Sequence, residues 1–188
     1  MIASRLKEET KIEHAAVEKE LMQIIRKIDS IEKYVSLLSI MYGYYASVER
    51  SVQPYLGPDN FPDFDARRKS KSILQDILYF SGTARPSLCL EIPVADSYSR
   101  ALGMVYVMEG STLGGKIIAG VIARQLNIPS DQGFSFFLSY KDKTQYMWES
   151  FKQHLEKTFD DREQEQVIDS ARQTFNTLKT WICQHAEN

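Results

Sequence analysis

The sequence predicts an all-α fold, arranged as a single-domain helical bundle over residues 1–188. Apolar residues recur at steps of three and four along most of the chain, which is the spacing of one helix face. No two alternating segments are joined by a hairpin turn, so no strand pair is predicted. A length of 188 residues with 43% hydrophobic residues suits one domain with a substantial core.

Three helices are predicted in the first half of the chain. The first lies near the N-terminus, where apolar residues follow helical steps. Asp29-Ser-Ile-Glu32 resembles a capping box and opens the second, over roughly 30–53. A break at 57–62, which contains glycine and proline, separates it from a third helix over about 63–80.

A glycine and two prolines within 81–93 favour a loop after the third helix. Asp96 or Ser97 is then expected to cap one long helix that extends to about residue 125. Residues 127–140 are predicted to be irregular, because proline, glycine and clustered phenylalanines occur there.

Two more helices complete the predicted bundle, over roughly 142–158 and 161–185. Asp160 precedes the last of them, and Glu163 stands three residues on. This spacing is typical of a capping box, in which the two side chains satisfy free N–H groups at the helix start.

Composition excludes several function classes. A net charge of −2 lacks the basic footprint of a nucleic-acid-binding protein. The two cysteines lie far apart, which favours a reducing, cytoplasmic setting, and the charged N-terminus lacks the apolar core of a secretory signal. Residues 101–123 are largely apolar, but Glu109 and Lys116 within them would be unfavourable in lipid, so we expect a buried central helix and no membrane anchor.

Residues 103–115 of the predicted central helix include four glycines, and each lowers helix stability by about 1 kcal/mol relative to alanine. Gly110 lies seven positions after Gly103, and Gly114 lies eleven after it. At about 100° per residue the three fall within about 20° of one line on the helix surface. A strip without side chains suits the close approach of another helix or of a large planar ligand.

A second group of residues lies on one side of the first predicted helix, at steps of three and four: Lys7, Lys11, His14 and Glu18. Imidazole is a common axial ligand of heme iron, and lysines can pair with carboxylates at the edge of such a ligand. A lone helical histidine is more often a surface or satisfied core residue, and we interpret His154 and His185 in that way.

Two segments resemble motifs of the heme oxygenase family, in the family's order and spacing. Residues 6–14, Leu-Lys-Glu-Glu-Thr-Lys-Ile-Glu-His, are similar to its proximal helix. Residues 106–115, Tyr-Val-Met-Glu-Gly-Ser-Thr-Leu-Gly-Gly, resemble the distal-helix motif of soluble bacterial members. The resemblance covers nearly the whole chain and implies an all-α domain that clamps heme between these two helices.

The resemblance assigns roles to the residues of both motifs. His14 would be the proximal iron ligand, with Glu18 holding its second ring nitrogen, directly or through water. Lys7 and Lys11 would lie near the heme propionates, and Tyr106 would contact a heme face, although an aromatic residue at helical spacing more often belongs to the core. The distal wall, including the catalytic positions, would be formed by Gly110, Ser111, Gly114 and Gly115.

In this family heme is both substrate and cofactor, and the resemblance therefore implies a heme-degrading monooxygenase. The products would be biliverdin, CO and ferrous iron, formed with O2 and electrons from a donor such as a ferredoxin or a reductase. A bare distal backbone would press close to the bound oxygen, and it would bend to admit heme and release the product.

The chain departs from the family pattern at two positions. Ser111 stands where vertebrate-type members carry aspartate, which leaves open the group that organises the distal water. Glu156 stands where members often place an arginine against a propionate, and Lys152 and Lys157 flank it.

Other function classes stay open at this stage. A heme-binding or sensing module would keep the clamp without turnover, and Ser111 favours this alternative. A di-metal oxygenase would need paired Glu-x-x-His motifs, none of which occurs in the sequence. A thiamin-cleaving enzyme would need a core cysteine, but Cys89 lies in a predicted loop and Cys183 near the C-terminus.

Overall fold

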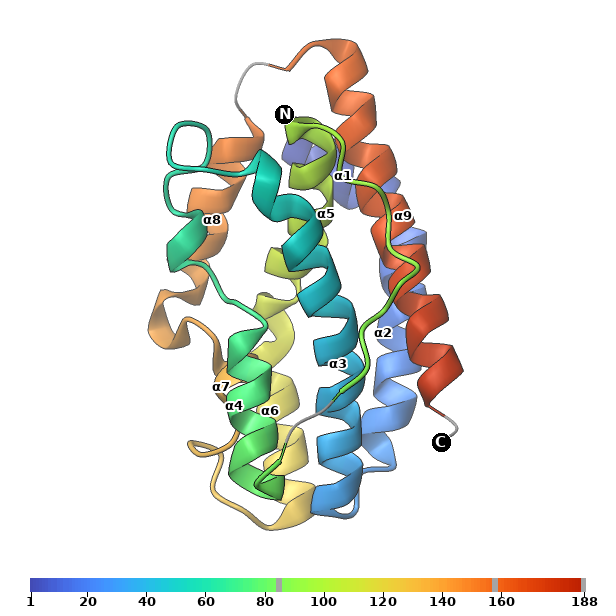
Figure 1. The fold of residues 1–188 in the computed structure, drawn as a ribbon, viewed down its shortest axis with the longest axis vertical. Coiled ribbons are helices and arrows are strands. Elements are labelled where there is room, and N and C mark those ends of the chain that lie inside the picture. The colour runs from blue at the N-terminus through green and yellow to red at the C-terminus, as the bar shows by residue number, and fades with distance from the viewer. Residues whose placement is uncertain (84–85, 157–158, 187–188) are drawn as a thin grey trace.

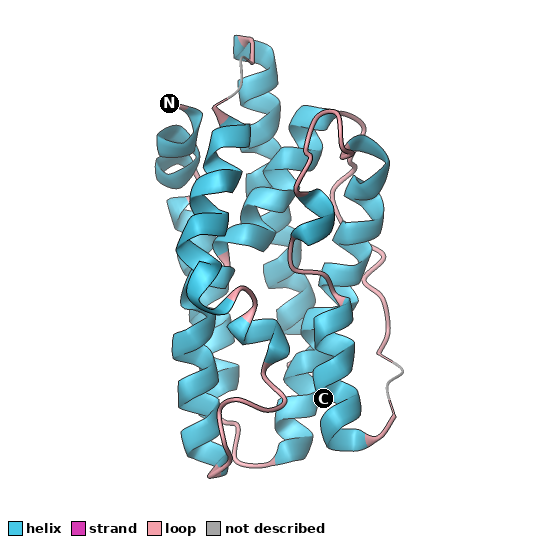
Figure 2. Cartoon of the chain, turned by 90° about the vertical axis from the view of Figure 1, so that its left-hand side faces the viewer, coloured by secondary structure: helices cyan, strands magenta, loops and turns pink. Residues whose placement is uncertain are grey.

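The computed structural model describes residues 1–83, 86–156 and 159–186. It consists mainly of helices, as the helical periodicity of the sequence predicts. Within these ranges no strand occurs, and the all-α prediction is confirmed. Most helices run along the long axis of the molecule (Figure 2). The predicted end of the helix at residue 158 and the side chain of Lys157 lie outside the described residues.

The N-terminal part forms three helices: α1 (Ile2–Glu9), α2 (Lys11–Arg26) and α3 (Ile31–Val52). Only Thr10 separates α1 from α2, and the backbone N–H of His14 still donates to the Thr10 carbonyl at 2.9 Å. The predicted cap at Asp29 is wrong by one residue, because the Ser30 side chain accepts the cap hydrogen bond from Lys33 N–H. Asp29 instead pairs with the Lys33 ammonium at 2.7 Å.

The third predicted helix is shorter than expected, since α4 spans Lys71–Ser81. Residues 63–70 form a loop with one short 3-10 turn, Phe64–Ala66. The physical reason is long-range bonding: Arg67 binds a side chain of the central helix, and the Arg68 N–H donates to the Tyr140 hydroxyl at 2.7 Å.

The long glycine-bearing helix is in fact two helices, α5 (Tyr98–Gly110) and α6 (Thr112–Leu126), with Ser111 at the joint. In an uninterrupted helix the Met108 carbonyl would accept from the N–H four residues later. Here that carbonyl accepts from the Ser111 hydroxyl at 2.7 Å and also from Arg68. Side-chain bonds to helix carbonyls of this kind bend helices.

The C-terminal part contains the short α7 (Ser135–Leu138), α8 (Thr144–Leu155) and α9 (Asp161–His185). The capping box of Asp160 and Glu163 is confirmed. Helix α9 runs the length of the molecule beside α2 (Figure 1), and α5 packs chiefly against α9 and also against α3.

By length and composition, one stretch among the described residues could cross a membrane, Tyr98–Leu126, with a mean hydropathy of 1.2. This stretch comprises α5 and α6. The side chains of Leu102, Met104 and Val105 are at most 4% exposed, because α5 lies in the core between α3 and α9. The apolar character is therefore explained by core packing.

Candidate active site

The imidazole of His14 is half exposed on α2 and held from two sides. Its Nδ1 lies 3.7 Å from Oε2 of Glu18, one turn later on the same helix. The ring meets Phe175 of α9 edge-on, with centroids 5.4 Å apart. Within the described residues Nε2 has no hydrogen-bond partner. A histidine that binds a metal through one ring nitrogen commonly has a carboxylate at the other nitrogen, which fixes the orientation of the ring. The imidazole of His14 has this arrangement, with Nε2 open.

A cavity of about 620 Å³ opens between α1, α5 and α8. It is lined by residues of both sequence motifs and by one face of α8: Met1, Ala3, Ser4, Lys7, Tyr106, Trp148, Glu149, Lys152, Gln153 and Glu156. Lys7 forms no ion pair within the described residues, whereas Lys152 pairs with Glu149 at 2.8 Å. The cavity thus combines aromatic walls with one lysine, Lys7, that has no ion-pair partner among the described residues.

Tyr106 connects the two motifs. Its hydroxyl forms a side-chain hydrogen bond with Thr10, at the joint between α1 and α2. Burial raises the pKa of Tyr106, an effect that the bond to Thr10 only partly offsets. The phenol therefore stays protonated at neutral pH, and it donates to Thr10, whose own hydroxyl donates to the Leu6 carbonyl.

Glu156 has a structural partner on α1. Its Oε1 accepts a hydrogen bond from the backbone N–H of Ala3 at 3.2 Å, which satisfies one of the free donors at the start of that helix. A carboxylate is favourable at this end of a helix. The residue that replaces the expected arginine thus joins α8 to α1.

The glycines of α5 and α6 other than Gly120 fall into two pairs with different surroundings. A Cβ on Gly103 would overlap the Val167 carbonyl oxygen of α9, and one on Gly115 would overlap the Phe137 carbonyl oxygen of α7. A Cβ on Gly110 would make ordinary contact with Trp148 at 3.8 Å, and one on Gly114 would meet open space. Gly103 therefore serves helix packing against α9, which is one of the two uses predicted for the strip.

These surroundings predict opposite effects of alanine at neighbouring positions. Gly115→Ala should destabilise the apo protein by about 1–3 kcal/mol, because the α7 backbone must move away from the new methyl group. Gly114→Ala should be neutral or stabilise by up to about 1 kcal/mol, since alanine favours the helix and meets nothing. Urea unfolding of both variants measures the difference, and equal stabilities would contradict this packing.

Ser111, at the joint between α5 and α6, has a fully used hydroxyl. Its oxygen accepts from the Tyr45 hydroxyl at 2.8 Å and from Nη2 of Arg68 at 2.5 Å. Its proton is directed at the Met108 carbonyl, 2.7 Å away. A serine hydroxyl offers one donor and two acceptor sites, so all three are taken.

Two other predicted site residues, Lys11 and Gly115, do not line the cavity. The Lys11 side chain is exposed on α2 and does not line the cavity. Gly115 is buried and faces α7. The structure therefore brings Lys7 and Tyr106 into one cavity, with Gly110 next to it through Trp148. His14 and Glu18 lie about two and three helical turns after Lys7, on α2.

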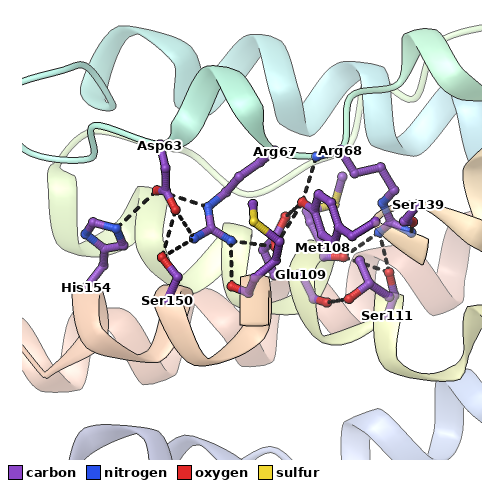
Figure 3. Close-up of polar contacts among 12 residues, drawn as sticks. Asp63, Arg67, Arg68, Met108, Glu109, Ser111, Ser139, Ser150 and His154 are labelled. Atoms are coloured by element: carbon purple, nitrogen blue, oxygen red, sulfur yellow. Dashed lines mark hydrogen bonds and ion pairs between the residues drawn. The ribbon is translucent and has the colours of Figure 1, made fainter. Parts of the chain in front are cut away.

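The site also contains residues that sequence reasoning missed. Arg67 and Arg68 reach from the 63–70 loop to the end of α5, as Figure 3 shows, and Tyr45 reaches Ser111 from α3. The only sequence signal is the pair of adjacent arginines in a segment predicted to be helical. Their targets lie roughly 40 positions away, at Met108 and Glu109.

A buried polar network extends from this joint toward α8 (Figure 3). Arg67 and Glu109 pair at 2.7 Å, with side chains only 1% and 4% exposed. Arg67 also pairs with Asp63 at 2.7 Å, and Asp63 lies 3.1 Å from Nε2 of His154. Burial opposes ionisation of Asp63, but the Ser150 hydrogen bond and the Arg67 charge together lower the pKa of that carboxyl.

Tyr140 joins the two arginines. Its hydroxyl lies 2.9 Å from Oε1 of Glu109 and accepts the backbone N–H of Arg68. Burial and the Glu109 charge raise the pKa of Tyr140, so the phenol stays protonated and donates to the carboxylate. Linked hydrogen bonds of this kind reinforce one another in a low-dielectric interior.

The fold defined by these helices is that of bacterial heme oxygenases. Solved structures with this fold include the heme oxygenase of Leptospira interrogans (20% identity, TM-score 0.78, 97% of this chain and 98% of that chain). They also include that of Neisseria meningitidis, solved with NO and CO bound (20%, 0.82, 100% and 92%). Heme oxygenase-1 of Synechocystis, solved in complex with heme, is similar too (18%, 0.77, 97% and 91%).

The family model described as heme oxygenase matches residues 1–184, and the chain belongs to this family. No curated protein sequence matches the chain at a significant level. The chain is accordingly an enzyme of heme degradation, with heme as its substrate. The likeness to the solved structures, at 20% identity or less, concerns the fold alone.

Proposed function

We propose that this enzyme opens the heme ring to biliverdin, releasing CO and ferrous iron, with O2 and electrons from an external donor such as a ferredoxin or a reductase. We place it in the cytoplasm, since both cysteines are free thiols. The observation that carries the proposal is the oriented imidazole of His14, whose Nε2 is open. Lys7, which lines the cavity, lies on α1, and His14 lies on α2, which follows α1 directly.

The spacing along α1 and α2 fits a porphyrin. Seven helical residues from Lys7 to His14 advance the chain by about 10 Å. This is comparable to the span from the centre of a porphyrin to its propionate carboxylates. With iron at Nε2 of His14, the propionates would point toward the cavity, where Lys7 and Lys152 supply cations.

The distal wall would be the backbone at Gly110 and Gly114. A Cβ on Gly110 would make only ordinary contact, and one on Gly114 would meet open space, so helix packing does not require either glycine. A bare backbone allows the ring to approach closely and leaves little room for water. When bound, heme supplies the redox centre and the carbon that is oxidised; the chain supplies the ligand, the walls and the charge pairing.

Reconstitution with haemin tests this proposal. Purified protein should bind haemin with an imidazole-ligated Soret spectrum, and a reductant with O2 should convert the complex to biliverdin, identified by chromatography. A heme spectrum that persists during turnover, with no biliverdin, would show a heme-binding module and contradict the proposed products.

Lys7 should influence how heme is seated in its plane. We expect Lys7→Ala to weaken heme binding only modestly, by roughly fivefold or less, because an exposed ion pair contributes about 1 kcal/mol or less. The ratio of biliverdin isomers should change more clearly, since the ring can then rotate. Lys33→Ala, which removes a lysine paired with Asp29 on α3, is the matched control. Unchanged affinity and isomer ratio would contradict the propionate role.

A further inference from the structure

The guanidinium of Arg68 forms hydrogen bonds to the joint between α5 and α6. Nη2 of Arg68 lies 2.5 Å from the Met108 carbonyl and 2.5 Å from the Ser111 hydroxyl (Figure 3). The last carbonyls of a helix lack intrahelical partners and form the negative end of its dipole. Arg68 places both hydrogen bonds and positive charge at that end of α5.

The Arg68 side chain is itself fixed in place. Its guanidinium lies over the ring of Phe136, 4.4 Å from the centroid, and 5.2 Å from that of Tyr45. Its backbone N–H donates to Tyr140, which is in turn bonded to Glu109. Aromatic rings on the guanidinium and a backbone anchor leave few alternative rotamers.

Arg68 also determines the state of the Ser111 hydroxyl. Because Arg68 and Tyr45 fill both acceptor sites, the hydroxyl proton is directed to Met108. Ser111 therefore has no free hydrogen-bond donor or acceptor position with which to hold a distal water. Its function in this arrangement is to tie the two halves of the wall, Gly110 and Gly114, on either side of it.

We propose that Arg68 is a positioning residue for the reaction: it locks the α5–α6 joint through Met108 and Ser111, so that the wall at Gly110 and Gly114 holds one shape against the substrate. Arg68 acts through these residues and is not assigned a contact with heme. The proposal rests on the proposed function for its effect on the product, but its effect on the joint is independent of heme.

Amide hydrogen exchange of the apo protein tests the effect on the joint. Hydrogen bonds to a charged group contribute about 1.5–3 kcal/mol, so Arg68→Gln should speed exchange over residues 108–114 by roughly tenfold or more. Tyr45→Phe, which removes one donor to Ser111 and no charge, should have a smaller effect at the same residues. Arg124→Gln is the matched control, since Arg124 donates to the Gly120 carbonyl on α6, away from the joint.

Product analysis of the same variants tests the effect on the reaction. Arg68→Gln should broaden the distribution of biliverdin isomers with the affinity for heme unchanged, and Arg68→Lys should restore only part of the selectivity, since lysine lacks the planar fork. Exchange and isomer ratios equal to those of Arg124→Gln would overturn the proposal. If the wild-type protein forms no biliverdin, the proposed function fails, whereas the exchange result still decides whether Arg68 locks the joint.

Discussion

Replacing His14 with alanine should remove the imidazole signature from the heme spectrum and lower turnover by more than about 100-fold. Removing even the outer-shell partner of a metal ligand lowers affinity or activity by about 10–100-fold, and loss of the ligand itself has a larger effect. No other histidine can take its place: His154 is buried beside Asp63, and His185 lies against Trp181 at the end of α9. Optical titration with haemin and a biliverdin assay measure both effects.

Three companion experiments make this result specific. Imidazole added to the His14→Ala protein should restore the spectrum, because the fold leaves the ligand position open. Glu18→Gln should keep the ligation but weaken it, with a loss of about tenfold, since the carboxylate orients Nδ1. His185→Ala should behave as wild type. An unchanged spectrum in His14→Ala would refute the assignment of the ligand.

Replacing Arg67 with methionine should destabilise the protein by about 3–5 kcal/mol, the penalty for leaving a buried charge without its partner. Glu109 is buried at the end of α5, and among the described residues Arg67 is the one cation that forms an ion pair with it. Tyr140 donates one hydrogen bond to that carboxylate but supplies no charge. Urea unfolding monitored by circular dichroism gives the free energy of unfolding.

The double variant Arg67→Met/Glu109→Met removes both charges of the ion pair. It therefore distinguishes the penalty of leaving one buried charge unpaired from the net contribution of the pair to stability. Replacing both members of a buried ion pair by apolar residues is often close to neutral, so the double variant should recover much of the lost stability. Lys33→Met, which breaks the exposed pair with Asp29, is the control and should change stability by about 1 kcal/mol or less. A loss below 1 kcal/mol in Arg67→Met would contradict this description of the network.

Local signals in the sequence were sufficient to place some of the helices. The capping box at Asp160 and Glu163 depends on residues three apart, and the last helix begins at Asp161 as predicted. Periodicity similarly located α3 and the central glycine-bearing segment. These features rest on contacts within one turn, which the linear sequence displays directly.

Features that depend on distant partners were not predictable in the same way. The joint at Ser111 requires Arg68 and Tyr45, which lie 43 and 66 positions earlier in the chain. The segment 63–70 has helical spacing, yet the bonds of Arg67 and Arg68 to α5 hold it as a loop. The different surroundings of Gly114 and Gly115 likewise follow from where α7 packs.

We propose that heme lies between His14 and the backbone at Gly110 and Gly114. A crystal structure of the haemin complex would show this directly. We predict iron at Nε2 of His14, the porphyrin against the two glycines, and the propionates at the cavity of Lys7 and Tyr106. Iron bound by another residue, or a porphyrin seated away from these glycines, would contradict the claim.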